Sequence, residues 1–567
     1  MDSRIENMEK FVMRYKAALH SKLTRQEFAS LLGLKPDSVR RRRLAVFHHS
    51  GLDLPLLKDD DNTSIATSDK IDKYTNHLNL LKGAKDSFTL KEKHKEENNQ
   101  KKRYVVTSAQ NATPVHEKFL ASILRYCDEM DAELIVIPYR YRNPTSVWSV
   151  NSEELEYWDA KIEPYLQRNH IKLNDHFRVL GHIKIQPTAV SPLSGFDGYT
   201  GEDSGVFGHP SIELKTIPTP SQKFPKILST SGAITLANYT DSKAGHKGKF
   251  NHSLAALVVE IDGDKFFQRH IHADEDTGAF YDLDTYFTPT YTESGHRVAA
   301  LVTGDIHAEF HDPNVEQATY TAKNSIMNTL QPEVWAIHDL EDFYARNHHH
   351  RGNDLLTYGK HHFGRNNVEE SLQISADFVD RHSREGMLNL IIKSNHDEAL
   401  DRWLRESDPK TDPENATFYH YMKYNQYKNL RKTKTGFETI DPFEFWCKNP
   451  ESQTGLRKID RTKFLRRDES FVVKDVEIGF HGDIGPNGSR GSLRSFSKVG
   501  PKLIIGHSHT PGIFQGVYQV GLSAMLNLEY ASGPSSWLHT HCVVYPDGHR
   551  TLIHVVKGEW KLENEEE

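Results

Sequence analysis

Five short polar motifs carry the residue types that bind metal ions in proteins. Their candidate ligand and acid–base residues are Asp305, His307, Asp339, Asn395, His396, Asp397, His481, His507 and His509. Each motif follows an apolar, strand-like run, and these runs begin at Val298, Val334, Leu388, Val476 and Lys502. Because strand ends open into the crevice where ligands bind in layered α/β folds, we expect the five motifs to converge on one site.

The mixture of donor atoms indicates which ions such a site would hold. Carboxylate and amide oxygens combined with imidazoles, and without thiolates, suit Mn²⁺, Fe²⁺, Zn²⁺ or Mg²⁺ better than copper(I) or an iron–sulfur cluster. The Asp-x-His segment 305–307 and the His-x-His segment 507–509 each place two side chains on the same side of an extended chain. A carboxylate shared by two ions roughly 3.5–4 Å apart is the usual arrangement for hydrolysis by metal-activated water. The sequence therefore predicts a two-metal hydrolytic centre.

The order of the five motifs resembles that of the calcineurin-like metallophosphoesterase superfamily, which runs D-x-H, GD-x-x-D, GNHD or GNHE, a later H, and GH-x-H. The match extends over residues 296–515. The joint match is specific, whereas any one motif alone would be weak evidence. The resemblance implies an α/β fold of the metallophosphoesterase type, a β-sandwich flanked by helices. It also implies hydrolysis of a phosphate ester with two divalent ions, of which Mn²⁺ is the expected one.

The resemblance implies a role for each motif residue. The first ion would be bound by Asp305, His307 and His509, the second by Asn395, His481 and His507, with Asp339 bridging the two. His396 would protonate the leaving oxygen or stabilise the transition state, and Asp397 would orient it. His338 and Ser394 stand where the family has glycine, which often allows close backbone approach. The loop geometry is therefore expected to differ at these two positions, and His338 is a candidate for an additional contact near the metals.

The sequence pattern of residues 1–50 predicts a helix, a turn and a second helix. Thr24 and Glu27 have the spacing of a capping box, and Pro36 lies at the first turn of the second helix. That helix carries the basic run Arg40, Arg41, Arg42 and Arg43. Such a run suits contact with DNA phosphates, so we predict a helix-turn-helix-like DNA-binding unit. The alternative is a helical hairpin used for linkage or for assembly of a homo-oligomer.

Two further segments favour a nucleic acid as the substrate. The insert 409–470, between the third and fourth motifs, interleaves aromatic and cationic residues that could stack on bases and contact phosphates. The glycine-rich loop 485–494 carries Arg490 and Arg494 beside the fourth motif, where backbone N–H groups and arginines could hold a phosphate. An ordinary helical cap and a plain flexible loop are the alternative interpretations of these two segments.

Three functions are compatible with these features. The DNA-binding unit attached to such a core is similar to the nuclease branch of the superfamily, which includes double-strand-break-processing nucleases and the pre-early host-DNA-degrading DNases of large tailed coliphages. This similarity implies a manganese-dependent DNase acting in the host cytoplasm. A phosphomonoesterase or protein phosphatase of the same superfamily is the first alternative. An inactive DNA-binding regulator is the second, although a decayed site should lack one or more ligands.

The bulk composition limits the remaining possibilities. The chain has 567 residues, and we expect a charged linker over 51–103, an α/β domain of unidentified role over 104–290 and the catalytic domain over 291–567. Fusion of 104–290 to the sheet of the catalytic domain is the alternative to a separate domain. The net charge of −7 means that contact with a polyanion must come from local basic patches. Three distant cysteines suit a reducing cytoplasm, and the sequence has no apolar run of about 18 residues that would predict a membrane span.

Overall fold

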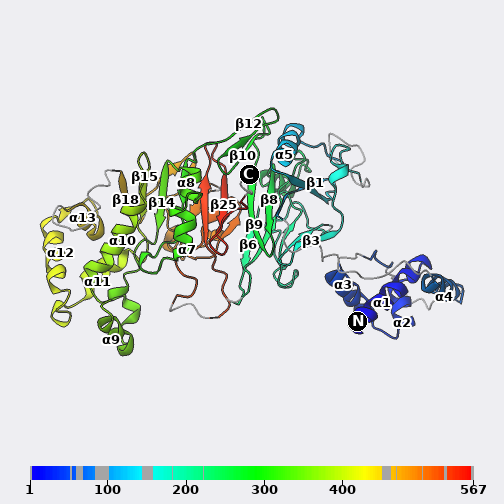
Figure 1. Ribbon diagram of the computed structural model, residues 1–567, viewed down its shortest axis with the longest axis horizontal. Helices are drawn as coiled ribbons and strands as arrows, with labels where there is room; N and C mark the ends of the chain where they lie inside the picture. The colour runs from blue at the N-terminus through cyan, green and yellow to red at the C-terminus, as the bar shows by residue number, and fades with distance from the viewer. Residues whose placement is uncertain are drawn as a thin grey trace.

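The computed structural model describes residues 3–50, 54–58, 68–83, 101–143, 157–181, 183–220, 223–449, 461–467, 469–500, 502–528 and 533–563. The chain is a mixed α/β protein with several sheets, and its N-terminal helices form a cluster at one end of the molecule (Figure 1). Within the described ranges, no helix is long and apolar enough to cross a membrane.

The N-terminal cluster contains the predicted helix, turn and helix. Its members are α1 (Ser3–His20), α2 (Arg25–Leu31), α3 (Pro36–Ser50) and α4 (Ser68–Gly83). The capping box at the start of α2 is confirmed, because the side chains of Thr24 and Glu27 each accept a hydrogen bond from the other residue's backbone N–H. Ala29 of α2 and Val39 of α3 are buried in the same small core.

This N-terminal core extends into the segment predicted as a linker. Lys70 of α4 lies 3.0 Å from the buried Glu27 carboxylate, and Tyr74 packs in the core of the first three helices. The unit therefore continues to α4 instead of ending at residue 50. The other end of the predicted linker also differs, because residues 101–103 belong to a strand. Apart from 54–58 and α4, the rest of 51–100 lies outside the described residues.

Residues 104–290 start with the predicted β-α-β unit. Strands β1 (Lys101–Gln110) and β2 (Ala132–Tyr139) are parallel, and α5 (Glu117–Glu129) connects them. The sheet is completed by β8 (Ala255–Asp262) and β9 (Lys265–His272) in the order β2-β1-β8-β9. This region also contains α6 (Lys243–Phe250) and a small sheet of β10 (Phe280–Asp282), β11 (Thr285–Phe287) and β12 (Thr292–Glu293).

A six-stranded sheet carries the first three motifs. Its strands in spatial order are β18 (Thr462–Leu465), β15 (Leu388–Ile392), β14 (Val334–His338), β13 (Ala300–Val302), β24 (Thr540–Val544) and β25 (Arg550–His554). The first four strands are parallel to one another. Their carboxyl ends therefore lie at the same edge of the sheet, which is where the first three motifs begin.

The other two motifs follow strands of a second, ten-stranded sheet. In spatial order it contains β19 (Val472–Val473), β20 (Val476–Glu477), β21 (Leu503–Ile505), β23 (Val517–Gln519), β22 (Gly512–Phe514), β6 (Leu214–Ile217), β7 (Lys226–Thr230), β5 (Ser204–Phe207), β4 (Phe177–Leu180) and β3 (His170–Asn174). Strand β20 precedes the fourth motif and β21 the fifth. The five motifs thus follow strands of two different sheets.

The ten-stranded sheet also joins the two regions that the sequence predicted as separate domains. Five of its strands come from 104–290 and five from 291–567. Strands β22 and β6 make the connection, with Gly512 paired to Lys215 and Ile513 paired to Leu214 in antiparallel register. A boundary at residue 290 would therefore divide one sheet.

The strand side chains alternate between two cores, as the pleat requires. Leu301, Ile337 and Ile391 point into a core that is shared with helices. Those helices are α7 (Pro313–Glu316), α8 (Ile326–Leu330), α10 (Val368–His382) and α11 (Glu398–Glu406). The neighbouring residues Ala300 and Leu390 point the other way, into a core that also contains residues of the four- and ten-stranded sheets. The order of layers is therefore helices, six-stranded sheet, then further sheets.

The insert 409–470 is a helical cap that ends in a strand. It contains α12 (Ala416–Lys428), a small hairpin of β16 (Arg431–Lys432) and β17 (Phe437–Glu438), α13 (Pro442–Lys448) and β18. Phe418 and Met422 of α12 are buried in the helix-side core, while Tyr424 and Tyr427 are 61% and 69% exposed. Residues 450–460 and 468 of the insert lie outside the described residues.

Candidate metal centre

Side chains from all five motifs meet in three small groups, with His396 as the member from the third motif. In each group, one His nitrogen or carboxylate oxygen per residue lies within 4.8 Å of the others. The groups are His307 with Asp339 and His509; Asp339 with His481 and His507; and His307 with Asp342 and His396. Because His307 and Asp339 each belong to two groups, the three groups form one continuous cluster.

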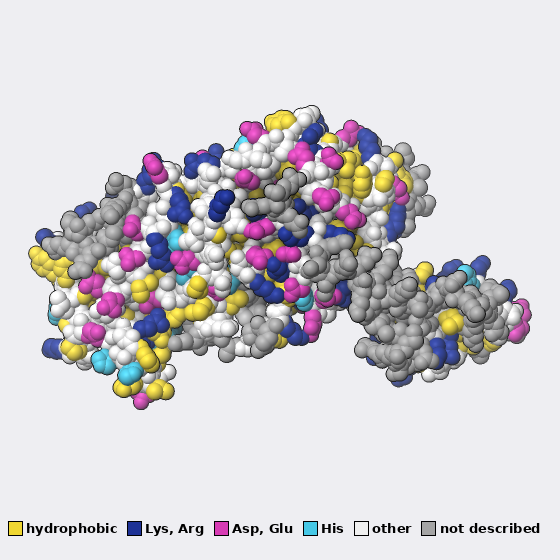
Figure 2. Space-filling view, viewed as in Figure 1, with side chains coloured by type: hydrophobic (Ala, Val, Ile, Leu, Met, Phe, Trp, Pro, Cys, Tyr) yellow, Lys and Arg dark blue, Asp and Glu magenta, His cyan; other side chains and the backbone are white. Residues whose placement is uncertain are grey.

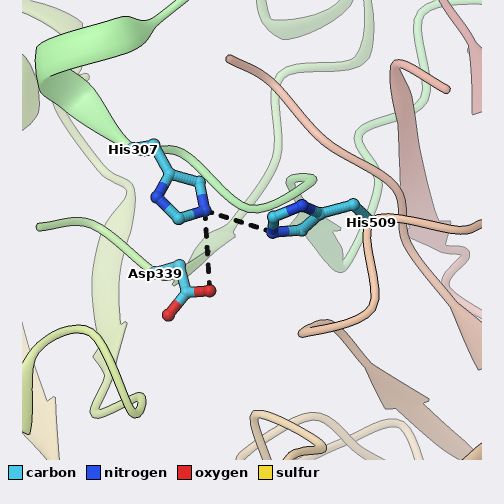
Figure 3. Close-up of side chains that lie close together, drawn as sticks. All are labelled: His307, Asp339 and His509. Carbon is cyan, nitrogen blue, oxygen red and sulfur yellow. Dashed lines mark hydrogen bonds and ion pairs between the residues drawn. The ribbon is translucent and has the colours of Figure 1, made fainter. Parts of the chain in front are cut away.

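The first group contains residues predicted to bind the first ion. Figure 3 shows His307, Asp339 and His509 turned toward one another, and Nε2 of His307 lies 3.1 Å from Nε2 of His509 and 3.7 Å from Oδ2 of Asp339. Oδ2 of Asp305 is 3.3 Å from Nε2 of His509. All four residues are buried. Two imidazole nitrogens and two carboxylate oxygens from three motifs therefore lie close enough to share one cation.

The second group uses the other oxygen of Asp339. Nε2 of His481 lies 3.3 Å from Oδ1 of Asp339, and the ring of His507 stands nearly perpendicular to that of His481 at a centroid distance of 5.3 Å. Oδ2 of Asp339 faces His307, as described above. The two oxygens of this carboxylate thus face two different histidine groups, which is the arrangement expected of a bridging ligand.

Several of these buried oxygens lack the partners that buried polar atoms normally have. Both carboxylate oxygens of Asp305 and of Asp339 have no hydrogen bond within the described part of the chain. The same is true of Oδ1 of Asn395, in the loop after β15. Buried carboxylate oxygens without hydrogen bonds are unfavourable unless positive charge lies beside them, so the donor set fits divalent cations.

The protonation of the cluster supports the same conclusion. Burial, with the charge of Asp339, raises the pKa of Asp305 to about 8. Burial opposes the charging of His307 and His481, but the Asp342 hydrogen bond to His307 and the Asp339 charge beside His481 raise the pKa of each to about 9. At neutral pH the metal-free cluster therefore holds protons where a bound cation would lie. Metal binding must release them and should weaken as the pH falls.

The backbone at four of these residues is in the left-handed region, which few non-glycine residues adopt. The φ values are +46° for His307, +45° for Asp339, +75° for His507 and +58° for His509. Conformations of this kind cost about 1–3 kcal/mol each and cluster at functional sites. The strained turns aim the side chains at one another from the ends of different strands.

The two positions that depart from the family pattern have clear local contacts. The His338 ring is buried beside His481, with the two Nδ1 atoms 3.4 Å apart, so it supports the second group from outside. Ser394 accepts a hydrogen bond at Oγ from the N–H of Asp397, whose Oδ2 accepts one from the N–H of Ser394. This reciprocal pair fixes the turn that carries Asn395 and His396.

These contacts change the role predicted for Asp397. Its Oδ2 accepts the Ser394 N–H and its Oδ1 accepts the N–H of Glu341, so the carboxylate holds two loops together. The carboxylate beside His396 is that of Asp342, with Oδ1 3.7 Å from Nδ1 of His396 and 3.2 Å from Nδ1 of His307. Asp342 therefore replaces Asp397 as the residue placed to orient His396. The sequence contained a hint of this role, because the second motif of the family pattern, GD-x-x-D, ends in a second aspartate, which is Asp342 here.

The arginines predicted to contact substrate have different surroundings. Arg494, on α14 (Leu493–Phe496), stacks over the ring of Phe514 at 4.7 Å and donates to Oγ of Ser191. Arg490 is exposed in the loop after the fourth motif. On α3, Arg40, Arg41 and Arg42 are exposed, while Arg43 donates to the carbonyl of Leu54.

Two histidines outside the motifs lie on the surface. His361 and His362 end α9 (Asp354–His362) and are exposed, on a projection where histidine and hydrophobic side chains gather at the lower left of Figure 2. In the same view Lys and Arg are interspersed with Asp and Glu. This face therefore presents no single basic surface, in agreement with the negative net charge.

Comparison with known proteins identifies a phage relative. Protein A1 of Escherichia phage T5 is 34% identical over 476 residues, which cover 81% of this chain and 83% of that protein. The chain belongs to the protein A1 family. A match of this extent includes most of the described fold, and the phage origin of the relative agrees with the prediction of a phage protein. No protein-family model matches the chain, and no solved structure matches it.

Proposed function

We propose that this member of the protein A1 family is a two-metal phosphodiesterase of the calcineurin-like metallophosphoesterase type, and that its substrate is DNA. The main support for this proposal is the position of Asp339, whose two oxygens face two separate histidine groups. Asp305, His307 and His509 would hold one ion, and Asn395, His481 and His507 the other. When bound, two such ions activate water for attack on phosphorus and offset charge on the phosphoryl oxygens.

The protein side chains would supply the proton transfer. His396 is 20% exposed, in contrast to the buried His307 beside it, so it can reach a bound substrate. Oδ1 of Asp342 lies 3.7 Å from its Nδ1, so the carboxylate charge would favour a ring orientation in which Nε2 acts on the leaving oxygen. The ring of His396 stands perpendicular to that of His307 at 4.8 Å, which fixes it at the rim of the metal centre.

Two surfaces away from the cluster support DNA as the substrate. The exposed Arg40, Arg41 and Arg42 lie along the second helix of a helix-turn-helix, the position from which such helices contact phosphates and bases. On α12, Tyr424 and Tyr427 are exposed, with Lys428 and Lys423 over their rings at 5.6 and 4.9 Å. Exposed aromatic rings bordered by lysines suit stacking on bases with contacts to phosphates.

The phage origin of the relative completes the proposal. A phage DNase of this kind would act on DNA in the host cytoplasm, and degradation of host DNA is the biological role that we propose. Mn²⁺ is the expected ion, with Mg²⁺, Fe²⁺ and Zn²⁺ as the alternatives that the same donor atoms accept.

The test is a panel of Mn²⁺, Mg²⁺ and Zn²⁺ against linear, circular and single-stranded DNA, with product length as the readout. We expect manganese-dependent loss of DNA, and loss of bound metal in Asp339→Ala. DNA that stays intact while an aryl phosphate monoester is hydrolysed would show a phosphomonoesterase instead. A protein that binds DNA but hydrolyses neither substrate with any ion would be a DNA-binding regulator.

A further inference from the structure

Two adjacent arginines follow the edge strand of the six-stranded sheet. Strand β18 runs parallel to β15 and ends at Leu465, so Arg466 and Arg467 emerge at the same sheet edge as the third motif. The environments of the two side chains differ. The Arg466 side chain is 46% exposed, whereas that of Arg467 is 14% exposed.

Arg467 contacts one carboxylate from each of two motif loops. Its Nη2 donates to Oδ2 of Asp483, and its Nη1 lies 3.6 Å from Oε2 of Glu398. Asp483 is two residues after His481 in the fourth motif, and Glu398 is three residues after Asn395 in the third. The guanidinium group therefore lies between these two loops and is attached to both.

The surroundings make this contact important for the spacing of the loops. Nη1 of Arg467 is buried without a hydrogen-bond partner among the described residues, so the guanidinium is held by its two charge contacts. Burial raises the pKa of Glu398, the charges of Arg467 and Lys393 lower it, and the charges of Asp401 and Asp483 raise it. Without the guanidinium, the Asp483 and Glu398 carboxylates would repel each other across the gap between the loops.

These two loops carry residues that the proposed function assigns to the same ion. We infer that Arg467 is a positioning residue for the second metal, which holds the loops of Asn395 and His481 at the separation that lets both bind one ion. This inference rests on the proposed function, because it takes these two residues as ligands. The first ion, between Asp305, His307 and His509, does not depend on this contact.

Arg466 provides a matched control for this role. It is the same residue type one position earlier, but its guanidinium pairs with Asp441 at 2.9 Å and Glu444 at 3.0 Å. Both carboxylates belong to the insert at the start of α13 and not to a motif loop. Replacing Arg466 or Arg467 by glutamine changes the net charge equally, so the comparison isolates the link between the two loops.

The experiment is a manganese titration of the full-length protein. The electron paramagnetic resonance signal of the free ion measures how much manganese remains unbound. We expect two sites in the wild-type protein and in Arg466→Gln. Arg467→Gln should keep one site at wild-type affinity and bind the second ion about 10- to 100-fold more weakly, the range found when residues that orient metal ligands are replaced. The spectrum of an exchange-coupled ion pair should then give way to that of a single ion at moderate manganese concentration.

Two further variants keep the test decisive. Arg467→Lys retains the charge without the planar fork and should restore part of the second affinity. Asp483→Asn removes the same contact from the other side, and it replaces Arg467→Gln if that variant does not melt cooperatively. Two wild-type affinities in the folded variants, or equal weakening of both sites, would overturn the inference. A wild-type protein that binds no manganese would instead overturn the proposed function.

Discussion

Replacing Gly506 by alanine should damage the metal centre through a single methyl group. Gly506 lies between β21 and His507, and a Cβ atom at this position would lie 2.4 Å from Oδ1 of Asp305 and 3.2 Å from Cγ of His338. The backbone of Gly506 is outside the left-handed region, so alanine is compatible with its conformation. The effect of the substitution is therefore steric and is directed at one proposed ligand.

The size of the effect follows from these distances. Ordinary contacts of a Cβ atom begin at 3.4 Å, so the Asp305 oxygen must move by about 1 Å. Asp305 is fully buried, and the ring of His338 closes the other side, which leaves little room for relaxation. A displacement of about 1 Å in a catalytic site can lower the rate about 10²-fold. This corresponds to about 2.7 kcal/mol of transition-state stabilisation.

The assay compares Gly506→Ala with Gly500→Ala, a control just before the same strand. At Gly500 the nearest atom to a new Cβ is Cδ1 of Leu503 at 3.6 Å, an ordinary contact. Manganese-dependent DNA hydrolysis and manganese affinity should fall in Gly506→Ala and stay near wild type in Gly500→Ala. Wild-type activity and affinity in Gly506→Ala would refute the position of Asp305 in the centre. Equal losses in both variants would point to a general effect on this segment.

Four other predictions follow from the described contacts. His396→Ala should keep its metal but hydrolyse DNA about 10²- to 10⁴-fold more slowly, and full activity would refute its role as the acid. Burial lowers the pKa of His270 from 6.5 to about 4, so its contribution to stability is complete above pH 6.5 and is lost as the pH falls toward 4. Urea unfolding should show a loss of about 3 kcal/mol from this residue over that range, and His270→Gln should reduce the slope; an unchanged slope would contradict the assignment. Replacing Tyr424 and Tyr427 by alanine should weaken binding of single-stranded DNA by about 1–3 kcal/mol per ring while hydrolysis of an aryl phosphate is unchanged, and unaltered affinity would remove α12 from the DNA-binding surface. Deleting residues 1–83 should weaken duplex binding and make its salt slope shallower by about 3, as expected for three exposed arginines; an unchanged slope would assign the unit to assembly instead.

The parts of the site that could be predicted from the sequence are those whose chemistry is local. An Asp-x-His or His-x-His segment after an apolar run contains its metal-binding donor atoms within three residues. His307 and His509 could therefore be selected without knowing the fold. The role of Asp342 could not be assigned in this way, because it depends on where the chain turns. The left-handed backbone at Asp339 redirects the loop, and only then does the Asp342 carboxylate reach His307 and His396.

The arrangement of the sheets was less accessible for a related reason. Apolar periodicity predicts that a segment is a strand, and the strands before all five motifs were found. Which strands pair is decided by contacts between distant segments, as in the pairing of Leu214 with Ile513. The contact between Arg467 and Asp483 is of the same kind, because each residue alone looks like an ordinary surface charge.

The pairing of β6 with β22 has a consequence for how the chain is made. About 300 residues separate Ile217 at the end of β6 from Gly512 at the start of β22. At synthesis rates of about 5–20 residues per second, the ribosome needs about 15–60 s to cover that distance. Throughout this time β6 is the open edge of a partly built sheet, and open edges recruit strands from other chains. Synthesis of this protein should therefore pass through an interval of aggregation risk that ends when β22 emerges, and its yield should depend on chaperones that act during translation.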